Sequence, residues 1–102
     1  MDISKSRRET MRWTALLTLN EARPVGAHGA LVLSVLRTMF PDATTLELRR
    51  EMEYLEARDL VEVIADPDGS YAAKLTRDGI DVVEYTVDCE PGIARPPQHW
   101  AD

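Results

Sequence analysis

The sequence has only one cysteine and two histidines, and these shortages exclude several kinds of site. Cys89 cannot form a disulfide within the chain, so we expect its thiol to behave as a small buried apolar group. Neither His28 nor His99 has a second imidazole, thiolate or carboxylate at the spacing of a zinc site. We therefore predict no metal site and no cofactor, and we expect His28 to cap or support a helix.

Long apolar runs are also missing. The longest stretch without Asp, Glu, Lys or Arg covers residues 24–36, far short of the roughly 20 residues of a membrane-spanning helix. No cleavable signal sequence follows the N-terminus, so we expect a cytosolic protein that does not enter a membrane. A chain of 102 residues has room for one compact domain.

Catalytic motifs are not found in the sequence. It has no glycine-rich phosphate loop, no Gly-x-Ser-x-Gly elbow and no nucleophile beside an obvious base. The neighbouring acids Glu51 and Glu53 would point to different sides of a helix and would not converge on a substrate. We therefore expect a protein that is not an enzyme.

Positive charge is scarce and unevenly distributed. The chain has 12 Lys and Arg against 18 Asp and Glu, which gives a net charge of −6. Most of the excess acid lies in the last quarter of the chain, whereas residues 1–23 are slightly basic. Nucleic-acid affinity depends on Lys and Arg that neutralise phosphates, so a DNA-binding surface would have to be local.

Helical spacing of apolar residues predicts two helices in the first half of the chain. Residues 4–22 form an amphipathic pattern that Ser4 or Ser6 could cap, with Trp13, Leu16 and Leu17 expected on one face. Residues 26–40 are apolar on almost every side, which is typical of a central buried helix. Val32, Val35, Leu36 and Met39 form its stripe, and Pro41 ends it.

A third helix is predicted over residues 44–58. Thr44 and Glu47 have the spacing of a capping box. Leu48, Met52 and Leu55 recur at the interval of one buried face. Asp59 then stands where the chain needs a left-handed residue to leave the helix, a position that glycine fills best and Asp tolerates.

The second half of the chain predicts a β-hairpin, a last helix and an extended arm. Alternating residues 60–64 and 70–75 read as strands around the turn DPDGS. Thr76 can cap a helix over residues 77–87. Beyond Cys89 three prolines favour an extended, polyproline-like segment. We expect a folded domain over residues 1–88 and an arm over residues 89–102.

The stretches LRREMEYLEARDLVEV (48–63), DPDGS and YAAKLTRDG (71–79) resemble the pattern of ArsR-, MarR- and PadR-type regulators. The resemblance covers residues 41–87. It implies a winged helix-turn-helix, mainly α with a small two-stranded hairpin, in the order α-α-α-β-β-α. The whole chain, with the tail VEYTVDCEPGIARPP (83–97), is also similar to small winged-helix proteins of Mu-like prophages. This implies a phage-derived, cytosolic DNA-binding regulator.

In such proteins the third helix enters the major groove and the hairpin lies along the backbone or minor groove. The resemblance makes Thr45, Arg49 and Arg50 candidates for reading bases of double-stranded DNA. Candidates for phosphate contacts are Arg37, Lys74 and Arg77, with Arg7 and Arg8 at the N-terminus. The sequence departs from the pattern at Asp59, where glycine is usual, and at the hairpin tip, where Asp66 and Asp68 replace basic residues.

Several interpretations stay open. Arg49 and Arg50 could instead pair with Glu53 on a solvated helix surface, because the spacings are four and three residues. Regulators of this shape commonly pair through their first and last helices, so we expect a homodimer. The arm could dock on a neighbouring subunit or another protein through Ile93, Arg95, Pro96, Pro97 and Trp100, or pack on its own domain.

Two functions therefore remain. The first is a dimeric transcriptional regulator that reads the major groove with the face of Thr45, Arg49 and Arg50. The second is a non-catalytic protein-interaction module that uses an acidic surface and the arm to bind a phage protein in DNA packaging or morphogenesis.

Overall fold

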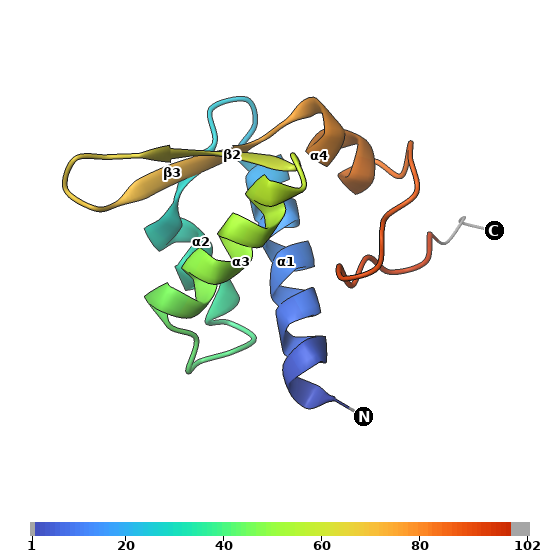
Figure 1. Cartoon of the computed structure of the whole chain (residues 1–102), viewed down its shortest axis with the longest axis horizontal. Coiled ribbons are helices and arrows are strands. Elements are labelled where there is room, and N and C mark those ends of the chain that lie inside the picture. The colour runs from blue at the N-terminus through green and yellow to red at the C-terminus, as the bar shows by residue number, and fades with distance from the viewer. Residues whose placement is uncertain (1, 99–102) are drawn as a thin grey trace.

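The computed structural model describes residues 2–98, which form four helices and a three-stranded antiparallel sheet (Figure 1). The fold is therefore mainly α with a small sheet, as predicted. In chain order the elements are α1 (Ile3–Glu21), β1 (Ala27–His28), α2 (Gly29–Leu36), α3 (Thr45–Ala57), β2 (Val61–Ala65), β3 (Tyr71–Leu75) and α4 (Arg77–Val83). Within this described part, no helix is both long and apolar enough to cross a membrane.

The long first helix is confirmed, but a different residue caps it. Asp2, rather than Ser4 or Ser6, is the N-cap, and its carboxylate accepts a hydrogen bond from Lys5 N at 3.1 Å. Leu17 does not share the buried face of Trp13 and Leu16 but is 40% exposed. The buried residues of α1 are Met11, Trp13, Ala15, Leu16 and Leu19.

The prediction of one helix over residues 26–40 is wrong at both ends. The two residues of β1 pair with Ala72 and Ala73 of β3, because the sheet edge gives their backbone groups partners that the start of a helix would leave open. The helix α2 therefore has only eight residues. Met39, expected on its buried stripe, lies beyond its end and is 47% exposed.

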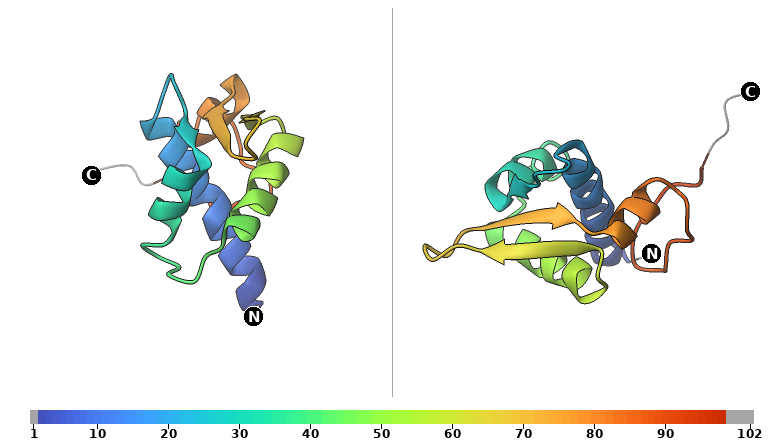
Figure 2. Two further views of the ribbon diagram at one scale, coloured as in Figure 1. Left: turned by 90° about the vertical axis from the view of Figure 1, so that its left-hand side faces the viewer. Right: turned by 90° about the horizontal axis from the view of Figure 1, so that it is seen from above.

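The predicted hairpin exists, but β1 makes the sheet three-stranded, with the order β1-β3-β2. The strands β2 and β3 pair from Val61 opposite Leu75 to Ala65 opposite Tyr71. Asp59, at the exit of α3, has a φ of 61°, so the predicted left-handed residue is confirmed. Seen from above, the hairpin reaches past the helices (Figure 2, right).

The helices α3 and α4 begin at the predicted caps. The hydroxyl of Thr44 accepts a hydrogen bond from Glu47 N at 3.0 Å, and that of Thr76 accepts one from Gly79 N at 3.1 Å. The last helix ends before the predicted residue 87, because Tyr85 has a φ of 62° and left-handed backbone cannot continue a helix.

One hydrophobic core joins the helices to the sheet. The predicted buried stripe of α3 is confirmed, because Leu48, Met52 and Leu55 are at most 2% exposed. The largest fully buried side chains are Met11, Leu16, Leu19, Leu36, Leu48, Met52, Leu55 and Val32.

Candidate nucleic-acid interface

The first turn of α3 lies on the same side of the molecule as the tip of the β2–β3 hairpin, at the left of Figure 1. Thr45 lines one cavity together with Gly69 and Ser70 of the hairpin, so the two elements are neighbours. Thr45 is exposed, and the adjacent Leu46 is 59% exposed. A long partner such as a duplex could therefore touch the start of α3 and the hairpin together.

Arg49 is held against the sheet. Its guanidinium carbon lies 4.7 Å from the centre of the Tyr71 ring, an arrangement that attracts a cation to the ring face. Within residues 2–98 it makes no ion pair with Glu53, which the spacing would have allowed. Arg49 is half-buried, and its guanidinium packs against the Tyr71 ring.

Arg50 differs from its neighbour. It is exposed, and no residue between 2 and 98 accepts a hydrogen bond or forms an ion pair with its side chain. Of the two arginines, Arg50 is therefore the one whose fork of donors is available to an external group.

Of the five predicted phosphate contacts, Arg37, Lys74 and Arg77 have partners within the protein. The Nε of Arg37 donates to the carbonyl of Ala43 at 2.9 Å. Lys74 Nζ lies 3.5 Å from a Glu62 carboxylate oxygen, and Arg77 Nε lies 3.7 Å from Asp81 Oδ1. Both cations are exposed, although Asp81 is half-buried, so each pair is worth about 1 kcal/mol or less and can be exchanged for a phosphate.

Arg7 joins α1 to the start of α3. Its guanidinium donates two hydrogen bonds to Glu47, at 2.7 and 2.9 Å, and lies 3.0 Å from Asp42. This fork lowers the pKa of Glu47 and raises that of Arg7. Arg7, predicted as a phosphate contact, is therefore neutralised by protein carboxylates.

The tip of the hairpin is closed on itself and negatively charged. The Ser70 hydroxyl lies 2.6 Å from Asp68 Oδ1 and 3.2 Å from Asp66 Oδ2, and Ser70 N also donates to Asp68. The Ser70 side chain and backbone lower the pKa of Asp68, so its carboxylate stays charged. A duplex phosphate would be repelled at this tip.

The described part of the arm packs on its own chain. Ile93 contacts the core, Ala94 N donates to Glu9 O at 3.1 Å, and the Tyr85 hydroxyl donates to Pro96 O at 2.8 Å. Among the candidates in this arm, Pro96 and Pro97 are exposed. Trp100 lies outside the described residues.

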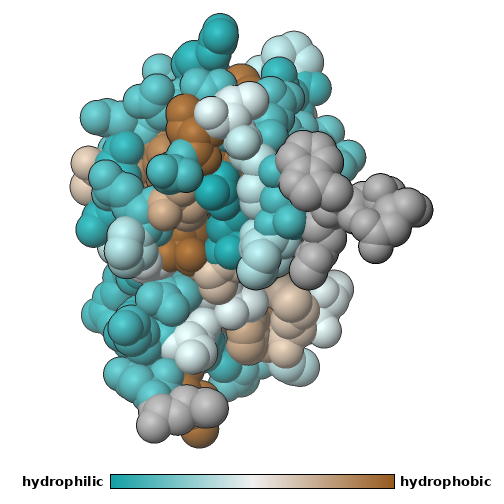
Figure 3. All heavy atoms as spheres, turned by 90° about the vertical axis from the view of Figure 1, so that its right-hand side faces the viewer, coloured by the Kyte–Doolittle hydropathy of each residue, from teal (hydrophilic) through white to brown (hydrophobic). Residues whose placement is uncertain are grey.

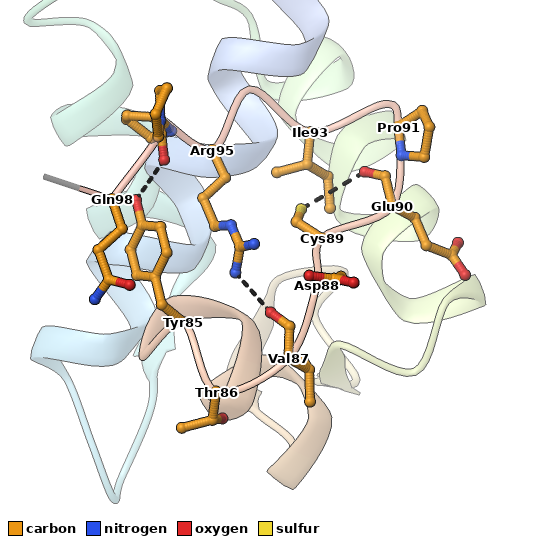
Figure 4. A pocket seen from close by; sticks show the side chains of 12 residues that line it. Tyr85, Thr86, Val87, Asp88, Cys89, Glu90, Pro91, Ile93, Arg95 and Gln98 are labelled. Carbon is orange, nitrogen blue, oxygen red and sulfur yellow. Dashed lines mark hydrogen bonds between the residues drawn. The ribbon is translucent and has the colours of Figure 1, made fainter.

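Arg95 fastens the arm to the end of α4 (Figure 4). It donates to Val82 O at 3.0 Å and to Val87 O at 2.9 Å, and its guanidinium lies 4.4 Å from the centre of the Tyr85 ring. A cation is well placed at a helix C-terminus, where backbone carbonyls lack partners. The side of the molecule that faces right in Figure 1, where the arm lies, has a mainly hydrophilic surface with apolar patches between the hydrophilic groups (Figure 3).

A buried ion pair beneath the arm was not foreseen. Arg12 Nε donates to Glu51 Oε1 at 2.7 Å, with side-chain exposures of 12% and 5%. Another nitrogen of Arg12 donates to Gly92 O at 2.8 Å, and its guanidinium lies 3.5 Å from the centre of the Tyr54 ring. The signal in the sequence was an acid on the apolar stripe of α3, between Leu48 and Met52.

In the described part of the chain His28 is exposed and Cys89 is half-buried. His28 is the N-cap residue of α2, but its side chain makes no capping hydrogen bond. Burial raises the pKa of the half-buried Cys89 thiol, which makes it less reactive. Over residues 2–98, no group of three or more His, Cys, Asp or Glu side chains could hold a metal ion.

Neither a scan against protein-family models nor a search of curated proteins finds a match to this chain.

Proposed function

We propose that the protein is a DNA-binding transcriptional regulator of winged-helix type, phage-derived and cytosolic, without catalytic activity or cofactor. The observation that carries the proposal is the exposed start of α3 beside a projecting hairpin (Figure 2, right), with an Arg50 that has no ion pair among residues 2–98. A helix of this kind fits the major groove, and the hairpin beside it can follow the backbone.

In this proposal Arg50 reads bases, because its guanidinium can donate two hydrogen bonds to guanine. Thr45 lies on the first turn of the same helix and adds a hydroxyl. Arg49 supports the hairpin through Tyr71 and reaches DNA only by leaving that ring. Lys74 and Arg77 supply phosphate contacts by exchanging their exposed acidic partners.

Dimerisation is part of the proposal, because within residues 2–98 few Lys and Arg side chains are left without a partner in the protein. A two-fold pair would double the phosphate contacts and read two half-sites. The apolar face of α4 is used within the chain, since Val82 and Val83 are at most 9% exposed. A groove between α1 and α2 instead leaves Leu17 and Leu31 exposed, and we propose that a second copy covers it.

The test is a gel-retardation assay with the DNA that surrounds the gene, because small regulators often bind nearby sites. Arg50→Ala should weaken specific retardation about tenfold or more, since a bidentate base contact contributes about 1–3 kcal/mol. Lys5→Ala is the control, because Lys5 is also exposed, is not among the predicted DNA contacts and has no ion pair within residues 2–98. Equal affinities of the two variants would reject the assignment of Arg50.

The net charge and the engaged cations favour a second candidate, a protein-interaction module in phage DNA packaging or morphogenesis. Within the described residues, the last hydrogen bond that holds the arm to the domain is the one that Pro96 O accepts from the Tyr85 hydroxyl. A deletion of residues 97–102 should therefore remove the end of the arm that could bind a partner and leave the fold intact. Capture of a purified phage partner by the full chain, lost in the deletion, would support this function. Capture that survives the deletion would exclude residues 97–102 as the segment that binds the partner.

A further inference from the structure

Leu46 is a large apolar side chain on the first turn of α3, and it is 59% exposed. The buried residues of this helix are Leu48, Glu51, Met52 and Leu55. Since an α-helix turns by about 100° at each residue, Leu46 lies almost opposite the middle of this buried stripe. Its side chain therefore points away from the core and into the solvent.

Leu46 shares its face of the helix with Arg50. The two residues are four positions apart, which places them on neighbouring turns about 6 Å apart along the axis. Arg50 is also exposed and has no ion pair within residues 2–98. An apolar group and a fork of donors thus stand together on the outward face of α3.

The major groove offers an apolar side chain very little to contact. Base edges present hydrogen-bond donors and acceptors there, and the apolar group among the four unmodified bases is the 5-methyl group of thymine. A leucine pressed against a polar base edge would remove water from that edge without replacing its hydrogen bonds. Leu46 therefore favours a base that carries a 5-methyl group and disfavours the others.

We propose that Leu46 determines specificity by packing against the 5-methyl group of a pyrimidine, which is either thymine or 5-methylcytosine. Because base pairs are stacked about 3.4 Å apart, the methyl group should lie one or two base steps from the guanine that Arg50 contacts. This inference rests on the proposed function, since it applies only if α3 enters the major groove.

The experiment compares three duplexes of one sequence, taken from around the gene, by fluorescence anisotropy. One is unmodified, one has uracil in place of thymine, and one has 5-methylcytosine in place of cytosine. If the methyl group belongs to thymine, the uracil duplex should bind about fourfold more weakly for each methyl group contacted, the effect of one buried carbon. If it belongs to 5-methylcytosine, the methylated duplex should bind more tightly by the same factor.

Three variants separate the leucine from other effects of the modified bases. Leu46→Ala should bind the three duplexes with equal affinity, because alanine is too short to reach the methyl group. Leu46→Met keeps the apolar reach and should keep the preference. Val87→Ala is the matched control, because Val87 is also exposed, at 46%, but lies beyond α4, so the preference should persist.

Two results would overturn the inference and leave DNA binding itself standing. One is equal affinity of the wild type for the three duplexes, and the other is a preference that Leu46→Ala leaves intact. No binding of the wild type to any duplex at about 50 mM salt would instead reject the proposed function, and this inference with it.

Discussion

Arg12 connects three parts of the chain that are far apart in sequence. From α1 it reaches Glu51 on α3, the ring of Tyr54 and the carbonyl of Gly92 in the arm. Its planar guanidinium can serve these partners together, because it has five donors and two faces. Without Arg12 the buried carboxylate of Glu51 would keep its desolvation cost and lose its counter-charge.

Arg12→Ala should therefore lower the free energy of unfolding by about 3 kcal/mol or more, the typical loss when one partner of a buried ion pair is removed. The measurement is urea denaturation followed by circular dichroism. Arg8→Ala, an exposed position on the same helix, should change stability by no more than about 0.5 kcal/mol. Similar losses in the two variants would show that the Arg12–Glu51 pair does not stabilise the fold.

The Arg7–Glu47 pair predicts a dependence of stability on pH. Arg7 lowers the pKa of Glu47 in the folded protein. A carboxyl group of this kind stabilises the fold above its unfolded pKa, about 4.3 for Glu, and loses that contribution as the pH falls through its folded pKa. Between about pH 6 and pH 3 the wild type should lose more stability than Glu47→Gln.

Denaturation midpoints across this pH range test the expectation. Glu53→Gln is the control, because Glu53 is exposed on the same helix and has no ion pair within residues 2–98. Its pH profile should follow that of the wild type. A Glu47→Gln profile that also follows the wild type would contradict the prediction.

The arm is an element in its own right, although it has no regular secondary structure. Hydrogen bonds from Arg12, Ala94, Tyr85 and Arg95 fix it to α1 and α4 at intervals. Gly92 lies against Tyr54 of α3 and has a φ of 110°. A Cβ atom there would overlap with the Tyr54 hydroxyl, so the path of the arm depends on glycine.

Gly92→Ala and Gly69→Ala make a matched pair, because both glycines have positive φ and only Gly92 faces a neighbour. Gly69→Ala should cost about 1 kcal/mol for the backbone alone. Gly92→Ala should cost about 2 kcal/mol or more, since it adds an overlap. Thermal denaturation measures both, and equal losses would mean that the arm does not pack on Tyr54.

The elements differ in how much of them the sequence predicted. The caps at Thr44 and Thr76, the stripe of α3 and the left-handed Asp59 follow from local chemistry, and all are confirmed. The strand β1 was missed, because its two residues pair with a strand more than forty positions away. Local periodicity carries no information about such a partner.

The candidate site was predicted only as a set of residues. The resemblance to winged-helix regulators named Arg49 and Arg50 as candidates, but it could not show that Arg49 is half-buried against the ring of Tyr71, which belongs to another element. The contacts of Arg7 and Arg12 likewise depend on how α1 packs against α3. Tertiary contacts of this kind cannot be read from a single stretch of sequence.

At the scale of the whole molecule, charge and apolar surface must both be explained. A net charge of −6 leaves little long-range attraction for DNA, so the proposed DNA binding would depend on a few local contacts and on the proposed pairing of two copies. The groove between α1 and α2 is the apolar surface that we propose for pairing, and Leu31 is 53% exposed beside it.

Leu31→Glu should convert a dimer to a monomer, because two buried carboxylates would lose hydration at the interface. Sedimentation velocity at matched concentrations measures the change. Ile64→Glu is the control, since Ile64 is 49% exposed on β2 and does not line the groove. A wild type that is already monomeric at high concentration would contradict the pairing.

The most direct test of the central claim is the salt dependence of DNA affinity, measured by fluorescence anisotropy with duplex DNA from around the gene. If α3 and its neighbours contact phosphates, affinity should fall at least tenfold between about 50 and 200 mM salt, because bound counterions are released on binding. No binding at the lower salt concentration, or an affinity that does not change with salt, would contradict the proposal that this protein binds DNA.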